Sequence, residues 1–290
     1  MVQKIFLSLT ALAIVASSCI KEQRVRCVAP VSVHLSGFTI GQEDFPSTKT
    51  TTDPADYEAV GALTLAFYQG STEVASLTQL KDDASTYDSF GEFSLSLPMG
   101  SYTLVGIAYT TKETSPFVLT SPTAAAYTGD HAYETFVCCQ DVNITGTGAV
   151  EISATLERVV SMLRVASTDG KSAGVSQMRM TLSAGGKSFS PSTGLATSNT
   201  GFANTVSVST AVGATTLCST ALFLATDEQT MDVTLETLDA DGNTVYSKTV
   251  TNVPFKRNRV TRLSGPLYAA PSTSSFQLST DWLNQQGISF

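Results

Sequence analysis

Apolar residues alternate with small or polar residues along most of this chain, and this pattern limits it to folds built from sheets. The segment 31–36 alternates residue by residue, and runs of the same kind begin at Leu63, Phe93, Val150 and Met178. Successive side chains on a strand point to opposite faces, so a period of two predicts half-buried β-strands. No long segment has the apolar spacing of an amphipathic helix. We therefore predict an all-β fold.

Turn sequences separate these runs. A Pro-Met-Gly turn at 98–100 lies between two predicted strands. An Asp-Gly pair at 241–242 separates the apolar runs 233–238 and 244–250, which is a strong signal for a β-hairpin. Short strands with closely spaced turns are typical of antiparallel β-sandwiches of the Greek-key type.

The chain of 290 residues is long enough for two sandwiches of ordinary size. A Gly-Thr-Gly turn at 146–148 and the run 150–156 close one set of predicted strands, and the run 159–165 opens a second set. We predict an N-terminal domain at 28–156 and a C-terminal domain at 157–290.

The first residues have the composition of a secretory leader with a lipid attachment site. Lys4 precedes an apolar run over 5–16, and small residues then lead to Cys19. The run is shorter than the roughly 20 residues that cross a bilayer as a helix, so it indicates a signal peptide over 1–18. We expect a mature chain in which Cys19 carries a lipid and 19–27 forms a tether. More than one acyl chain makes such an anchor stable.

The composition argues against nucleic-acid binding and against catalysis. The net charge of −8 disfavours polyanionic partners. Of the two histidines, His34 lies on the exposed side of a predicted strand and His131 in a predicted loop. The sequence has no Ser/His/Asp arrangement, no Gly-rich phosphate loop and no metal-ligand spacing. We predict no enzymatic activity, no cofactor and no metal site.

Four cysteines follow the lipid site, at Cys27, Cys138, Cys139 and Cys218. Cys138 and Cys139 are adjacent, so on a strand they face opposite sides. Buried or incidental thiols are the simpler interpretation. A disulfide, for example with Cys218, fits an oxidising compartment, and the sequence leaves the pairing open.

Four segments together resemble the fimbrillin family, whose members build type V pili on Gram-negative anaerobes. LTLAFYQG at 63–70 is similar to the strand after a variable loop, and LPMGSYTLVGIA at 97–108 to a Pro-x-Gly-x-Tyr hairpin. LERVVSMLRV at 156–165 resembles the strand that starts the second domain, and VPFKRNRVTRLSGPLY at 253–268 resembles a late Arg-Asn segment. The resemblance implies two transthyretin-like sandwiches in tandem, exported as a lipoprotein to the outer surface.

The resemblance also implies assembly with other pilus subunits by strand exchange. In the family, a protease removes the first strand of a subunit, and the groove then accepts a strand from a neighbour's C-terminal end. In this chain the strand to be removed is 31–40, with Val31, Val33 and Leu35 on its apolar side. The next basic residue after this strand is Lys49, which is the candidate processing site.

Family stalk subunits are typically cut after Arg, and this chain departs from that pattern. It has no Arg between Arg26 and Arg158. The departure favours an anchor or accessory subunit that keeps its lipid.

The candidate donor is the C-terminal strand 275–279. Phe276 and Leu278 alternate along it, and Trp282 lies just beyond. The alternative interpretation is that this strand closes the second domain's own sheet.

These expectations combine into a structural fimbrial subunit, or a pilus anchor or accessory lipoprotein, that supports cell adhesion. It would lie at the outer membrane and cell surface, bound there by its lipid, with other pilus subunits as partners. The alternative is a monomeric surface lipoprotein that binds a glycan or a host ligand. An exposed aromatic platform would favour that alternative, but Trp282 is the only tryptophan.

Overall fold

The computed structural model describes residues 28–39, 51–52, 54–83, 85, 87–110, 116–268 and 277–279. The extended elements of these ranges are β-strands gathered into four sheets, so the fold is all-β, as the alternation predicted. Within the same ranges, no helix has the length and apolar character needed to cross a membrane.

The largest sheet has eight strands. They are β1 (Val28–Thr39), β2 (Thr51–Thr52), β3 (Ala62–Gln69), β4 (Thr72–Leu80), β5 (Glu92–Pro98), β6 (Gly100–Tyr109), β9 (Thr135–Ile144) and β10 (Val150–Arg158). The order across the sheet is β2-β1-β10-β9-β6-β3-β4, and β5 also pairs with β1.

Three smaller sheets complete the described fold. A short one, in the order β13-β8-β7, contains β7 (Phe117–Ser121), β8 (Ala124–Tyr127) and β13 (Ser188–Phe189). The second, in the order β15-β11-β18-β19, contains β11 (Ser161–Ser167), β15 (Leu217–Leu222), β18 (Val260–Gly265) and β19 (Gln277–Ser279). The third, in the order β14-β12-β16-β17, contains β12 (Gln177–Leu182), β14 (Phe202–Ser207), β16 (Glu228–Leu238) and β17 (Thr244–Lys256).

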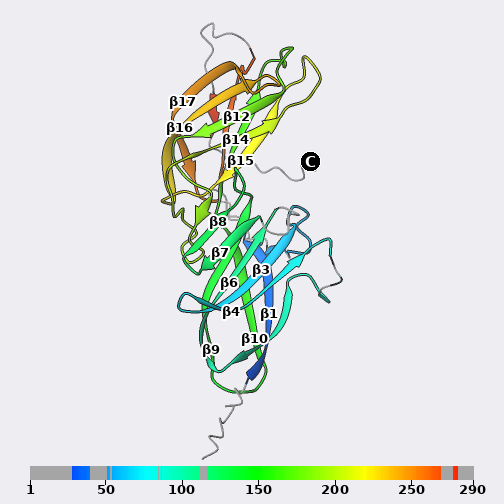
Figure 1. Cartoon of the computed structure of the whole chain (residues 1–290), viewed down its shortest axis with the longest axis vertical. Coiled ribbons are helices and arrows are strands. Elements are labelled where there is room, and N and C mark those ends of the chain that lie inside the picture. Colours follow the sequence, from blue (N-terminus) through cyan, green and yellow to red (C-terminus); the bar gives the residue numbers. More distant parts are fainter. Residues whose placement is uncertain are drawn as a thin grey trace, which may run out of the picture.

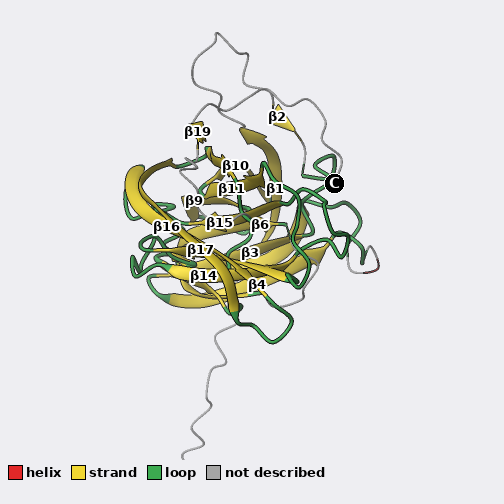
Figure 2. Ribbon diagram, turned by 90° about the horizontal axis from the view of Figure 1, so that it is seen from above, coloured by secondary structure: helices red, strands yellow, loops and turns green. Residues whose placement is uncertain are grey.

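The molecule is elongated, with the large sheet toward one end and the sheet of β12, β14, β16 and β17 toward the other (Figure 1). Viewed along the long axis, the strands overlie one another and most loops lie at the sides (Figure 2). The hairpin predicted at the Asp-Gly pair joins β16 to β17, and Gly242 takes φ 83° in its turn. Such a positive φ is a conformation that glycine adopts without a steric penalty.

Two strand pairs are parallel, in a fold that is otherwise antiparallel over the described strands. β1 runs parallel to β10, and β11 runs parallel to β18. In each case an early strand of a sheet lies beside a late one, because a parallel pair needs a long connection between its members. Alternation in the sequence sets which face is apolar, but it carries no information on strand direction.

Separate apolar cores lie on the two faces of β3. Leu63, Leu65 and Phe67 pack into a core shared with β1, β5, β6, β9 and β10. Ala62 and Tyr68 face a second core, which also contains residues from beyond β10. A strand that is buried on both faces is apolar almost throughout, which explains why β3 alternates less clearly than β1.

Aromatic side chains fill the second core, where the large sheet meets the C-terminal part of the chain. The rings of Phe189 and Phe223 stack with their centroids 4.2 Å apart, and Tyr127 stacks on Phe223 at 6.2 Å. The third core lies between the sheet of β11 and the sheet of β12, with Leu163 and Met180 among its fully buried members. The C-terminal part is therefore a sandwich of two facing sheets.

Candidate functional site

Strand β1 is the first described strand of the chain, and it lies inside the largest sheet. Val31 pairs with Val150 of β10 on one side and with Leu95 of β5 on the other. Val33 pairs in the same way with Ile152 and Phe93, so the ladder continues along the strand. The strand observed at Val28–Thr39 begins earlier than the predicted segment 31–40, and Ile40 lies outside the described residues.

The three predicted side chains of β1 are all in the first core. Val31 and Val33 are 1% exposed and Leu35 is 0% exposed, and Ala29 joins them at 0%. Val28, Pro30, Ser32 and His34 on the other face of β1 are exposed, and the ring of His34 lies 3.8 Å from the Glu92 carboxylate at the surface. The apolar face of β1 therefore fills a groove between β5 and β10.

Leu35 occupies a space that exists because position 106 is glycine. A Cβ atom on Gly106 would lie 3.2 Å from a methyl carbon of Leu35 and 2.6 Å from the sulfur of Cys138. Burial raises the pKa of the Cys138 thiol to about 12, so this thiol is neutral and acts as a small apolar group. The end of the groove is therefore a pocket shaped for a large aliphatic side chain.

Strand β5 depends on β1 for its place in the sheet. Among the described strands, β1 is the only one that pairs with β5. One side chain also ties β5 to the far edge of the sheet, because buried Gln79 of β4 accepts from the backbone N–H of Gly91 and donates to the carbonyl of Glu92. Loss of β1 would leave β5 without a strand partner and would open the first core.

The chain that follows the candidate processing site is fixed to the body by a polar cluster. The hydroxyl of Tyr57 donates to Glu134 at 3.2 Å, and the guanidinium of Arg158 donates to the same hydroxyl at 3.4 Å. Burial and the Glu134 carboxylate raise the pKa of Tyr57. Sequence reasoning missed this cluster, although an Arg that ends an apolar strand was a visible signal.

Several predicted site residues lie outside the described residues. They are Cys19, Cys27, Lys49, Phe276 and Trp282. The backbone of Leu278 is described in β19, where it pairs with Leu263 of β18 at the edge of its sheet.

Three cysteines fall within the described part of the chain, and all three are free thiols: Cys138, Cys139 and Cys218. Cys138 is buried and Cys139 is half-buried, as expected for neighbours that face opposite sides of a strand. Over the described ranges, no group of His, Cys, Asp and Glu side chains could hold a metal ion.

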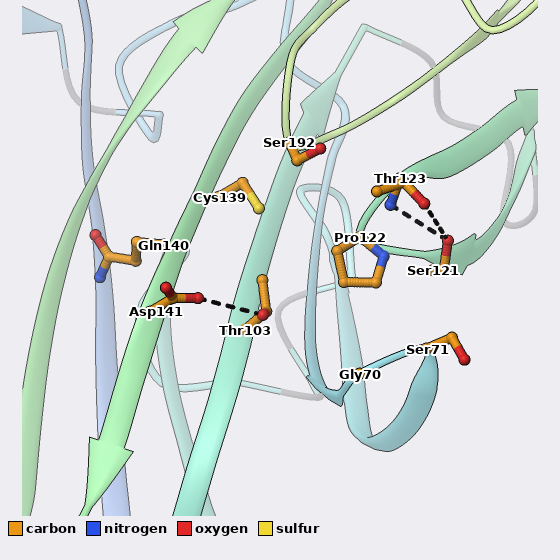
Figure 3. Close-up of a pocket in the computed structure, with 10 residues that line it drawn as sticks. All are labelled: Gly70, Ser71, Thr103, Ser121, Pro122, Thr123, Cys139, Gln140, Asp141 and Ser192. Atoms are coloured by element: carbon orange, nitrogen blue, oxygen red, sulfur yellow. Dashed lines mark hydrogen bonds between the residues drawn. The ribbon is translucent and has the colours of Figure 1, made fainter.

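A polar pocket of about 530 Å³ lies on the other side of β6 and β9 (Figure 3). Its walls come from the β3–β4 turn, the β7–β8 turn, β6, β9 and one residue of the C-terminal part. Most of its polar groups are hydroxyls and amides, and Asp141 accepts from the Thr103 hydroxyl at 3.4 Å. No aromatic side chain is among its lining residues, which are Gly70, Ser71, Thr103, Ser121, Pro122, Thr123, Cys139, Gln140, Asp141 and Ser192.

The sequence profile of a family of unknown function, DUF6562, matches residues 92–286. The chain belongs to this family. The match covers β5 to β19 and begins after β1, so the strand that fills the groove precedes the matched region. No curated protein sequence matches the chain.

Solved structures similar to the chain include proteins described as fimbrial and adhesive. The fimbrial anchor protein Mfa2 from Porphyromonas gingivalis is 11% identical, with a TM-score of 0.48 over 88% of this chain and 98% of that one. A candidate cell adhesion protein from Bacteroides ovatus is 12% identical, with a TM-score of 0.48 over 90% and 100%. A fimbrial assembly protein from Parabacteroides distasonis is 12% identical, with a TM-score of 0.39 over 87% and 95%. These descriptions fall in the class that the sequence resemblance indicated, and identities of 11–12% show a likeness of fold alone.

Proposed function

We propose that this chain is a structural protein of a surface fimbria, acting either as a subunit or as a lipid-held anchor or accessory protein, and that it joins its neighbours by strand exchange. The observation that carries the proposal is the position of β1. It is the first described strand, it pairs on both sides, and its apolar face fills a groove in the first core. No catalytic or cofactor role is part of this proposal.

The energetics of β1 suit a strong joint. Burial of a side chain such as Val31, Val33 or Leu35 contributes about 1.5–3 kcal/mol, and each backbone hydrogen bond contributes about 1 kcal/mol net. A whole domain is stable by only about 5–15 kcal/mol. A body that loses β1 would therefore lose much of its stability, and a replacement strand would restore it.

The order of the features along the chain separates the two roles. Cys19 precedes β1 and Lys49 follows it. A cut after Lys49 would therefore separate the rest of the chain from both the lipid and β1. A subunit that accepts a strand would be cut and an anchor would stay whole. The lack of Arg between Arg26 and Arg158 favours the uncut anchor at the outer membrane.

The same proposal gives the C-terminal segment the role of donor. β19 adds only three paired residues to the edge of β18. A short edge strand has few backbone bonds to break before it can pair with another protein. Phe276, Leu278 and Trp282 would supply its apolar anchors.

Limited proteolysis tests the proposal. Purified non-lipidated protein from Ile20 onward is treated with a Lys-specific protease, and mass spectrometry locates the cut while unboiled gels report size. A subunit gives a cut after Lys49 and then, when mixed with a partner subunit, a joined species that persists on unboiled gels, whereas a Lys49→Gln variant gives neither. An anchor keeps β1 and binds a partner subunit through its C-terminal segment. A protein that keeps β1 and joins no other subunit in either direction would refute the proposal.

The polar pocket favours one second candidate, a monomeric surface lipoprotein that binds a glycan. Its hydroxyl and amide groups, with Asp141, could pair with sugar hydroxyls, and the Asp141 carboxylate already accepts from the Thr103 hydroxyl at 3.4 Å. This function predicts ligand-dependent stabilisation of a monomer. Thermal unfolding with and without surface glycans, in wild type and in Asp141→Asn, separates it from strand exchange.

A further inference from the structure

We propose that the groove filled by β1 selects its strand by side-chain size, and that it excludes the C-terminal segment of this chain. The inference rests on the proposed strand exchange. The occupant is an extended strand of a different subunit, which runs parallel to β10 and offers a small, two β-branched and one large aliphatic side chain in that order. The groove would then accept a heterologous partner and prevent joining of this chain to itself.

The large end of the groove is defined by the glycine at position 106. Both methyl carbons of Leu35 lie within 3.3 Å of the place where a Cβ on Gly106 would stand, and the Cys138 sulfur is closer still. Such distances leave no room for a side chain at position 106. The missing side chain makes room for Leu35, so this position of the groove takes a large aliphatic group.

The small end lies at Ala29. This residue pairs with Leu97 of β5 and is completely buried in the same core as Leu35. Between the two ends, Val31 and Val33 are buried against β-branched and apolar partners on both neighbouring strands. Close-packed interiors reject added volume, so the groove is graded from small to large in the direction of β1.

The C-terminal segment has a different pattern. Its alternating residues are Phe276, Leu278, Thr280 and Trp282. If Phe276 takes the place of Ala29, then Thr280 falls where Val33 is buried. Every shift along the groove brings an aromatic ring to a position that holds Ala or Val, or brings a polar side chain into the core. The segment therefore suits a groove of another shape, on another protein.

A nicked full chain gives a direct test. A recognition sequence for a site-specific protease replaces residues 44–49, the chain is cut there, and labelled peptides compete with β1 in moderate urea. The peptides are residues 28–39, residues 274–285, and two variants of the first, Ala29→Phe and Ser32→Phe. Ser32 is on the exposed face of β1 and serves as the matched control.

The native 28–39 peptide and its Ser32→Phe variant should bind equally well. The Ala29→Phe variant and the 274–285 peptide should bind at least about tenfold more weakly, since overpacking of this size exceeds the energy of a tenfold change. Equal binding of the 274–285 peptide would overturn the inference. Failure of the native peptide to enter would instead refute strand exchange itself.

Two further measurements keep the two outcomes apart. Alkylation of Cys138 reports an empty groove, because this thiol lies beneath Leu35, and Cys139 on the opposite face is the internal control. In the uncut chain, Ala29→Phe should lower the urea midpoint and Ser32→Phe should not. An uncut Ala29→Phe variant with an unchanged midpoint would refute the size grading even if strands exchange.

Discussion

The Oε1 atom of Glu134 lies 2.6 Å from Nε of Arg158, where β9 begins and β10 ends. The two side chains are 15% and 7% exposed, and the guanidinium lies 4.8 Å from the centre of the Phe136 ring. Arg158 also donates to Asn258 in the turn before β18, at 3.1 Å. This ion pair therefore connects three parts of the molecule: the large sheet at the start of β9 and the end of β10, the segment around Tyr57, and the C-terminal part of the chain.

Removal of one partner of this pair should be costly. An Arg158→Met variant leaves the Glu134 charge buried without its partner, which typically destabilises a protein by about 3–5 kcal/mol. We expect a loss of about 3 kcal/mol in urea unfolding. The control is Lys256→Met, because the Lys256–Glu228 pair is on the surface and should contribute nothing measurable. An Arg158→Met protein as stable as wild type would contradict the structural role of the pair.

Tyr68 should make the protein sensitive to alkaline pH. Burial, and then the Glu73 carboxylate, raise the pKa of Tyr68 from 10.0 to about 12. A pKa that is higher in the folded state means that the folded state favours the neutral phenol. Its contribution to stability is complete below pH 10.0 and is lost as the pH rises toward 12. Between these limits, wild type should lose more stability than Tyr68→Phe, and unfolding titrations with parallel pH dependence would rule this out.

Gly106→Ala should destabilise the first core. The added Cβ would meet the Cys138 sulfur and the Leu35 methyl groups, and overpacking of this kind costs about 1–3 kcal/mol. Gly129→Ala is the control, since nothing lies within 4 Å of its added Cβ. A Cys138→Ala change in the Gly106→Ala background should restore part of the loss. If chemical denaturation finds the two glycine variants equally stable, the close contact is not a constraint.

Alternation alone predicted the strand class and the apolar face of β1. The side chains of Val31, Val33 and Leu35 are buried and that of His34 is exposed, because a period of two assigns faces directly. The direction of strands was beyond this reasoning, since a parallel and an antiparallel partner bury the same face. The turn at 98–100 shows a related limit: β5 pairs with β1, and β6 pairs with β3 and β9, so the predicted turn joins strands that do not form a hairpin.

The long-range parts of the site were not readable from the sequence. The space at Gly106 depends on Leu35 and Cys138, which are distant in the chain and meet only because β1, β6 and β9 share a core. The Tyr57–Glu134–Arg158 cluster depends in the same way on three separate segments. The polar pocket combines two turns with residues of β6 and β9, and the turn sequences indicate only that they are turns.

Gln79→Met should loosen β5. The change keeps the side-chain volume but removes the partners of the Gly91 N–H and the Glu92 carbonyl. Buried groups left without a hydrogen bond cost about 1–3 kcal/mol each. We expect faster amide exchange at Gly91 and along β5, with little change in β9. Exposed Gln69→Met is the control, and unchanged exchange at Gly91 would show that β1 alone holds β5 in place.

Deletion of residues 271–290 separates the two interpretations of the C-terminal strand. β19 pairs with β18 over three residues at the edge of its sheet, and the described members of the third core all lie before residue 269. We therefore expect a folded protein, with a cooperative unfolding transition near that of the full chain, that no longer joins a partner subunit.

The matched control is Phe276→Ser with Leu278→Ser in the full-length chain, which keeps the backbone and removes two of the candidate apolar anchors. It should fold like wild type and fail to join, because strand addition takes its specificity from alternate side chains. If the deletion instead abolishes the unfolding transition, the strand closes the second sandwich of its own chain, and the donor role must be assigned to another segment.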